Sequence, residues 1–226
     1  MQIGVLGATG PAGRGLAARL GSVGHDVIVG SRDLARAEAT VDQLRERCGA
    51  RVATLCAGTN ADAADAGDLV VIATTWEGAV DTARAHADGL AGKVVVSMAN
   101  GLAKVDREFR PVIPDEGSLA QAIQVAAPRG RIVAAFQHVP AAAFADLDQP
   151  LESDVIVCGD DDPARELVLD LVVGLPDLRG FDGGSLANAI GIEAFAALLL
   201  SVNLRHRGRG TLRLLGVAGY TPADHR

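Results

Sequence analysis

The chain has 226 residues, 49% of them hydrophobic and 22% charged, which is typical of a globular protein large enough to bury a substantial core. Its 21 basic and 28 acidic side chains give a net charge of −7, and only 3% of its residues are aromatic, so neither a basic surface nor stacking rings favour a nucleic-acid partner. The three cysteines, Cys48, Cys56 and Cys158, form no CxxC pair, a pattern typical of reduced thiols in the cytoplasm.

The first 145 residues alternate short β-branched runs with alanine-rich segments of helical length. This alternation predicts βαβ units, and therefore an α/β fold with a Rossmann-type, doubly wound parallel sheet. We expect strands at Ile3–Leu6, Val27–Val29, Val52–Leu55, Leu69–Ala73, Val94–Ser97 and Arg131–Phe136. We expect helices at Ala12–Val23, Leu34–Cys48, Ala79–Ala87 and Leu119–Ala126. The stretch Arg107–Ser118, with two prolines and a glycine, has no clear period and is expected to be a loop.

The remainder of the chain has a different pattern. A further strand is expected at Asp154–Cys158, a helix at Ala164–Val173 and a long apolar helix at Leu186–Leu204. We therefore predict a dinucleotide-binding Rossmann domain at 1–145 and a small C-terminal α/β domain at 146–226 that closes the substrate cleft.

No targeting or membrane signal is expected. The chain opens on a strand-like run with no basic segment before it, which is unlike a signal peptide. The apolar stretch Ala194–Leu200 is far shorter than the about 20 residues that a membrane span needs. These features predict a cytoplasmic protein with no membrane partner. The apolar helix Leu186–Leu204 exceeds what a small domain covers, which predicts a homodimer that buries part of it.

The segment after the first strand carries a phosphate-binding pattern. Ala8, Gly10 and Gly13 occupy the three glycine positions of G-x-G-x-x-G, directly before a predicted helix. Glycine at the second position lets the backbone approach a pyrophosphate, and the helix N-terminus offers free N–H groups to it. The alternative is a merely structural turn. The predicted cofactor-binding residues here are Gly7, Thr9, Gly10, Pro11, Ala12 and Gly13.

The end of the second strand distinguishes the two nicotinamide cofactors. An NAD site usually has an acidic residue there, whereas this chain has Ser31 and Arg32, with Arg36 four residues on. A hydroxyl and guanidinium groups suit a 2′-phosphate. Asp33 is expected to cap the next helix. The pattern favours NADP, unless these are ordinary surface residues.

One histidine is the candidate catalytic residue. The only tyrosine, Tyr220, belongs to no Tyr-x-x-x-Lys pair, and we find no HExxH, GxSxG or metal-ligand spacing, so no metal site is expected. His138 follows the last predicted strand of the nucleotide-binding sheet, where ligands bind in such folds. We expect it to hydrogen-bond a substrate carbonyl and to stabilise charge during hydride transfer. The alternative is a loop histidine whose hydrogen bonds are satisfied within the protein.

Several segments together resemble the NADPH-dependent reductases of the deazaflavin coenzyme F420, the F420-dependent NADP oxidoreductases. The similarity covers nearly the whole chain, through Gly7–Gly13, Gly30–Arg32, Trp76–Glu77, His138–Ala141, Val157–Asp161 and Leu186–Asn188. The resemblance implies hydride exchange between NADPH and coenzyme F420, with the deazaflavin in the cleft between the domains beside His138. It also implies NADP contacts from Thr9, Ser31, Arg32 and Arg36, and we expect further contacts from Thr74, Thr75, Met98 and Ala141.

The chain departs from this family on its long C-terminal helix. Ile190, Ala194 and Ala196 stand where relatives carry arginine, serine and threonine, which removes three polar groups from what we expect to be one helix face. Two alternatives therefore stay open. One is a related reductase that acts on another small molecule, such as an imine or a dehydrated metabolite, with NADPH or reduced F420. The other is a non-catalytic NADP(H)-binding module.

Overall fold

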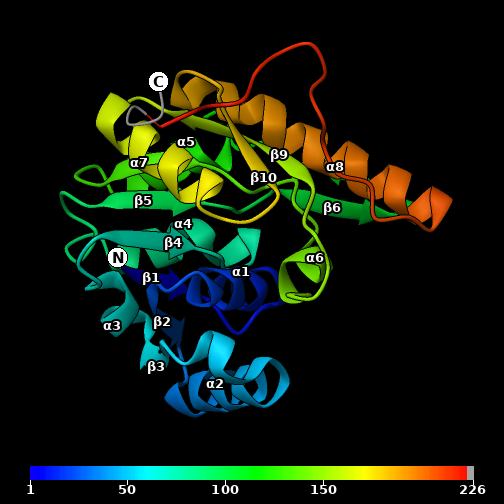
Figure 1. Cartoon of the computed structure of the whole chain (residues 1–226). Helices are drawn as coiled ribbons and strands as arrows, with labels where there is room; N and C mark the ends of the chain where they lie inside the picture. The colour runs from blue at the N-terminus through cyan, green and yellow to red at the C-terminus, as the bar shows by residue number, and fades with distance from the viewer. Residues whose placement is uncertain (223–226) are drawn as a thin grey trace.

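A computed structural model describes residues 1–222 and shows one eight-stranded sheet in the order β10-β9-β8-β5-β4-β1-β2-β3 (Figure 1). The strands are β1 Gln2–Leu6, β2 Asp26–Ser31, β3 Leu55–Thr59, β4 Leu69–Ile72, β5 Val94–Ser97, β8 Arg131–Ala134, β9 Ser153–Gly159 and β10 Leu178–Asp182. All neighbouring pairs are parallel except β8 and β9, which are antiparallel. This confirms the predicted Rossmann-type sheet.

Helices cover both faces of the sheet and divide the core into two layers. Buried side chains of α1, α2 and α7 pack on one face, and those of α3, α4 and α5 pack on the other. The central strands are buried on both sides, which explains why their sequences are continuous apolar runs. The helices are α1 Pro11–Ser22, α2 Leu34–Cys48, α3 Asn60–Ala64, α4 Trp76–Ala85, α5 Leu119–Ala126, α6 Ala141–Ala145, α7 Asp162–Val173 and α8 Ala189–His206, with 3₁₀ turns at η1 Gly49–Val52 and η2 Leu186–Asn188.

Two predicted elements are wrong. The strand expected at Val52–Leu55 begins only at Leu55, because Gly49–Val52 forms a 3₁₀ turn. The loop expected at Arg107–Ser118 contains strand β7, Glu108–Pro111, which pairs antiparallel with β6, Leu102–Val105, in a separate two-stranded sheet. Such a short hairpin leaves only weak alternation in the sequence.

The residues after 145 extend the same sheet. β9 pairs with β8, and β10 then pairs in parallel with β9 across the crossover helix α7. The strand β10 was not predicted, because Leu178–Asp182 contains an arginine and a glycine and lacks an apolar run. The division into domains at residue 145 stays a prediction, and residues 223–226 of the predicted C-terminal domain lie outside the described part of the chain.

A buried arginine fastens the segment after β8 to the first helix. Arg19 of α1 is 5% exposed, and its guanidinium donates hydrogen bonds to four backbone carbonyls of residues 143–149. Gly15 allows the close approach, since a Cβ there would lie 2.7 Å from the Cβ of Phe144. Helices α1 and α6 therefore lie side by side (Figure 1).

Helix α8 is attached to α5 by a buried carboxylate. Glu193 is 6% exposed and accepts hydrogen bonds from the backbone N–H groups of Leu119 (2.8 Å) and Ala120 (3.1 Å) at the start of α5. Burial raises the pKa of Glu193 to about 7, although the two N–H donors act in the opposite direction. The segment Leu186–His206 is long and apolar enough to cross a membrane by length and composition, with 39% of its most apolar window buried.

We expect Glu193 to make stability depend on pH. The pKa of Glu193 in the folded state lies above the unfolded value of 4.5, so the folded state binds the proton more tightly than the unfolded state does. The stability that this proton contributes is therefore fully present below pH 4.5 and is lost as the pH rises through about 7. Urea unfolding should be measured for wild type and Glu193→Gln from about pH 4 to pH 8. Over this range the free energy of unfolding of wild type should fall by about 1–3 kcal/mol relative to that of the variant. The exposed Glu38→Gln is the control, and a pH-independent difference for Glu193→Gln would contradict this account.

Candidate functional site

The turn between β1 and α1 depends on two glycines for packing and leaves a third open. Gly7 has a φ of 74°, and a Cβ there would lie 2.6 Å from the Cγ2 atom of Thr74. A Cβ on Gly13 would lie 2.9 Å from the Cα atom of Ala8. A Cβ on Gly10 would meet only the carbonyl oxygen of Gly7, at 3.5 Å. The space in front of Gly10 is therefore not filled by the protein itself.

The N-terminus of α1 faces this space. Pro11 takes the first helical position and no side chain caps the helix, so the first turn presents uncapped backbone N–H groups and the positive end of the helix dipole. An open glycine in front of an uncapped N-terminus fits a pyrophosphate. The residues predicted from the sequence at this turn, including Thr9 and Ala12, thus lie together around one cradle whose chemistry suits an anion.

Basic side chains lie beside the end of β2. Ser31 is 4% exposed, and its Oγ atom accepts a hydrogen bond from the backbone N–H of Asp33 at 3.2 Å. The Asp33 carboxylate accepts from the N–H of Ala35 at 3.0 Å, which confirms that it caps α2. Arg32 and Arg36 are exposed, and neither guanidinium has an ion pair within residues 1–222. The arrangement fits a 2′-phosphate, because two unpaired guanidinium groups follow a hydroxyl at the strand end.

Beyond the cradle, the carboxyl ends of β5 and β8 open into a hollow of about 170 Å³ that α8 covers. It brings together the predicted residues Ala12, Met98, His138, Ala141 and Ala196. The other lining residues are Asn100, Phe136, Gln137, Val139, Pro140, Leu199, Leu200 and Asn203. Thr74 and Thr75 are absent from this lining. They follow β4: Thr74 lies against Gly7 of the cradle, and Thr75 is the N-cap residue of α4.

His138 is buried and has a defined tautomer. It is 4% exposed, and its Nε2 atom lies 2.5 Å from the backbone carbonyl oxygen of Asp154. A carbonyl only accepts, so Nε2 carries the hydrogen and donates it. Burial lowers the pKa of His138, which favours the neutral ring, and Nδ1 is then an acceptor with no partner among the described residues. This differs from the expected role, because the free ring nitrogen, Nδ1, is available as an acceptor and cannot donate to a substrate carbonyl.

The backbone carbonyl that orients His138 belongs to Asp154, whose side chain is held in place by several hydrogen bonds. The Asp154 side chain is fully buried and binds Arg179 through two hydrogen bonds of 2.7 and 2.6 Å. Arg213 and the backbone N–H of Leu214, both from the segment after α8, also donate to this carboxylate, at 3.1 and 2.5 Å. Sequence reasoning missed the role of Asp154, and the available signal was an aspartate at the start of an otherwise apolar predicted strand.

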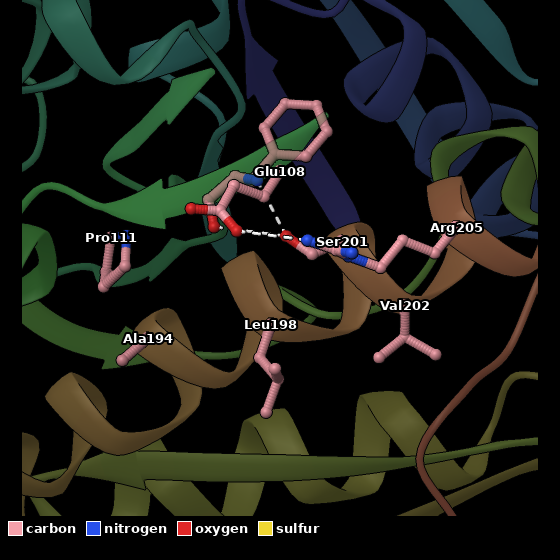
Figure 2. Close-up of a pocket in the computed structure, with 8 residues that line it drawn as sticks. Glu108, Pro111, Ala194, Leu198, Ser201, Val202 and Arg205 are labelled. Atoms are coloured by element: carbon pink, nitrogen blue, oxygen red, sulfur yellow. Dashed lines mark hydrogen bonds and ion pairs between the residues drawn. The ribbon is translucent and has the colours of Figure 1, made fainter. Parts of the chain in front are cut away.

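The other side of α8 lines a second hollow, of about 510 Å³, against β7 (Figure 2). The hydroxyl of Ser201 accepts from the N–H of Phe109 at 2.7 Å, and Arg205 pairs with Glu108 at 3.3 Å. Ala194 lines this outer hollow, whereas Ala196 lines the inner one beside His138. The expectation that positions 190, 194 and 196 share one helix face is therefore wrong, because residues two apart on a helix point in different directions. In the described part of the chain, no group of three or more His, Cys, Asp or Glu residues is arranged to hold a metal ion.

The sheet, the cradle and the hollow are those of an α/β protein of the Rossmann, dinucleotide-binding class, with a hollow beyond the cradle under α8. Residues 2–101 match the family model described as NADP oxidoreductase, coenzyme F420-dependent. The chain is 35% identical to the F420-dependent NADP reductase of Methanocaldococcus jannaschii, over 93% of this chain and 96% of that protein. The corresponding protein of Methanothermobacter thermautotrophicus is 31% identical over 92% of each chain.

A solved structure from Arthrobacter sp. FB24, named provisionally as an F420-dependent NADP reductase, superposes with a TM-score of 0.75. It is 29% identical and covers 91% of this chain and 93% of its own. The chain therefore belongs to the F420-dependent NADP reductase family.

Gly10 and Gly13 should respond differently to substitution by alanine. Gly13→Ala forces a Cβ against Ala8 and should lower the free energy of unfolding by about 1–3 kcal/mol. Gly10→Ala has room in the protein and should change stability by less than about 0.5 kcal/mol, yet its methyl group should weaken NADPH binding at least about tenfold. Urea unfolding and calorimetry measure the two effects. Normal NADPH affinity in Gly10→Ala would show that phosphates bind elsewhere.

Proposed function

We propose that this protein transfers a hydride between NADP(H) and the deazaflavin coenzyme F420 in the cytoplasm. The observation that carries the proposal is the inner hollow, in which predicted NADP contacts, Met98 and Ala141, lie together with His138 and α8. The family relationship over more than nine-tenths of the chain supports the same activity.

NADP fits the cradle, because the uncapped start of α1 and the open Gly10 would receive its phosphates. Ser31, Arg32 and Arg36 would hold the 2′-phosphate, which NAD lacks. When bound, NADPH supplies the hydride and coenzyme F420 supplies a ring that accepts it. The protein's own contribution is to bring the two rings together and to keep water away from them.

The residues around the hollow are suited to this positioning. The apolar side chains of Ala196, Leu199 and Leu200 form a wall for the flat face of a ring and exclude water. His138 offers Nδ1 as an acceptor for an N–H group of the second substrate, held in place by the Asp154 carbonyl. Since no strong acid or base is needed for hydride transfer between two such cofactors, the absence of a catalytic triad is consistent with this function. We further propose that the segment after residue 145 closes the cleft through α8.

The direct test mixes the purified protein, NADPH and oxidised coenzyme F420 and follows the deazaflavin absorbance. We expect turnover by wild type, and a loss of about 10- to 100-fold in His138→Ala with NADPH affinity within about threefold of wild type. His206→Ala, at an exposed position on α8, is the matched control. NADPH binding without F420 reduction would reject the proposed substrate and favour another small acceptor. An unchanged rate in His138→Ala would reject the role of the histidine.

We also propose that the protein is a homodimer that pairs through the outer face of α8. Leu198 is 59% exposed and Val202 is 43% exposed, one turn apart, and Ile190 extends the same face. A single helix with an exposed apolar stripe is suited to an isologous interface, because a two-fold axis brings the stripe of one copy against the same stripe of the other copy. The neighbouring Glu108–Arg205 ion pair supplies a polar rim (Figure 2).

Light scattering should report twice the monomer mass for wild type. Leu198→Lys should shift the protein toward the monomer, because a charge in an apolar interface is costly. Leu215→Lys, at a residue that is 91% exposed and lies outside the helix, should leave the mass unchanged. A monomeric wild type, or an equal effect of the two substitutions, would contradict the interface.

A further inference from the structure

Three residues that line the inner hollow each carry a buried hydrogen-bond acceptor that has no donor. These acceptors are the Oδ1 atom of Asn100, the Oε1 atom of Gln137 and the Nδ1 atom of His138, each buried and without a partner among residues 1–222. Gln137 is only 6% exposed and His138 only 4%. All three residues line the hollow. Buried polar groups are nearly always paired, so three acceptors together indicate a ligand that brings N–H or O–H donors.

The protein itself fixes which atom of each side-chain amide is left without a hydrogen-bond partner. Asn100 Nδ2 donates to the backbone carbonyl of Gln137 at 2.6 Å, and Gln137 Nε2 donates to the backbone carbonyl of Ser97 at 3.1 Å. A carbonyl cannot accept from an amide oxygen, so neither side chain can be flipped without losing its bond. The oxygens of Asn100 and Gln137 are therefore held as acceptors.

The hollow selects a neutral donor. Its lining contains no carboxylate, no lysine and no arginine. A cation such as an ammonium group would be desolvated there with no opposite charge, which is unfavourable. A primary amide instead carries two N–H donors without charge and matches two acceptors. The amides follow β5 and β8, at the edge of the sheet on which the nicotinamide of a bound dinucleotide lies.

We propose that Asn100 and Gln137 accept the two N–H groups of the nicotinamide carboxamide and so set the orientation of the nicotinamide ring. This inference rests on the proposed function for the presence of NADP, and it adds two specificity-determining residues to the site. With the carboxamide bound to these two side chains, Nδ1 of His138 is left for the second substrate. The ring is then held by its amide edge, which determines the face that it turns toward that substrate.

The test compares NADP⁺ with its 3-acetylpyridine analogue, in which a methyl group replaces the amide nitrogen. Calorimetry with wild type should show the analogue binding at least about tenfold more weakly, because two buried acceptors stay unpaired. Gln137→Met and Asn100→Leu should weaken NADP⁺ about tenfold and the analogue much less, so that the preference disappears. Gln124→Met is the control. Gln124 lies on α5, forms hydrogen bonds with the backbone of Gly130 and Ile132, and does not line the hollow.

The experiment measures only dinucleotide binding and uses no coenzyme F420, so its outcomes test the inference independently of F420 reduction. Equal binding of the two dinucleotides to wild type would overturn the assignment and leave the proposed function standing. Variants that lose both dinucleotides equally would show a structural role only and would also overturn it. If wild type binds neither dinucleotide, the proposed function itself fails. The comparison in wild type needs no variant, so the inference stays testable even if the substitutions prevent folding.

Discussion

The close contact between the start of α1 and the ends of β1 and β4 is the constraint on which the site depends. Gly7 and Gly13 permit it, because any Cβ at these positions would overlap neighbouring atoms. The contact directs the uncapped N-terminus of α1 along the carboxyl edge of the sheet. Arg19, farther along α1, then holds the segment that follows His138. One helix therefore positions both the phosphate cradle and the loop that lines the inner hollow.

Three polar side chains in the mostly apolar lining of the inner hollow use only part of their hydrogen-bonding capacity. The side-chain amides of Asn100 and Gln137 each donate a hydrogen bond to a backbone carbonyl, and the one N–H of His138 donates to the backbone carbonyl of Asp154. Each unpaired buried acceptor costs about 1–3 kcal/mol, which a ligand with matching donors recovers on binding. Because these side chains are already fixed, little reorganisation accompanies binding. The ion pairs of Asp154 with Arg179 and Arg213 contribute to this rigidity from outside the hollow.

The sequence was sufficient for the parallel sheet and for the glycine turn before α1, because both follow from local patterns: apolar runs of strand length, and glycines at fixed spacing before a helix. That this turn binds phosphate stays a prediction. The sequence also placed His138 at the correct edge of the sheet. Its hydrogen-bonding role could not be predicted, since it depends on a carbonyl 16 residues away on the antiparallel neighbour β9. Asn100 and Gln137 were missed for a similar reason, although each is a polar residue soon after an apolar strand. The direction of Ala194 and Ala196 required the observed position of α8.

The central claim is that the carboxyl edge of this sheet binds a dinucleotide with a 2′-phosphate beside Ser31, Arg32 and Arg36. Calorimetric titration with NADPH and NADH tests it most directly. We expect NADPH to bind at least about tenfold more tightly, and Arg32→Ala to remove most of this preference while the exposed Arg47→Ala keeps it. Equal or tighter binding of NADH, or no binding of either dinucleotide, would contradict the account.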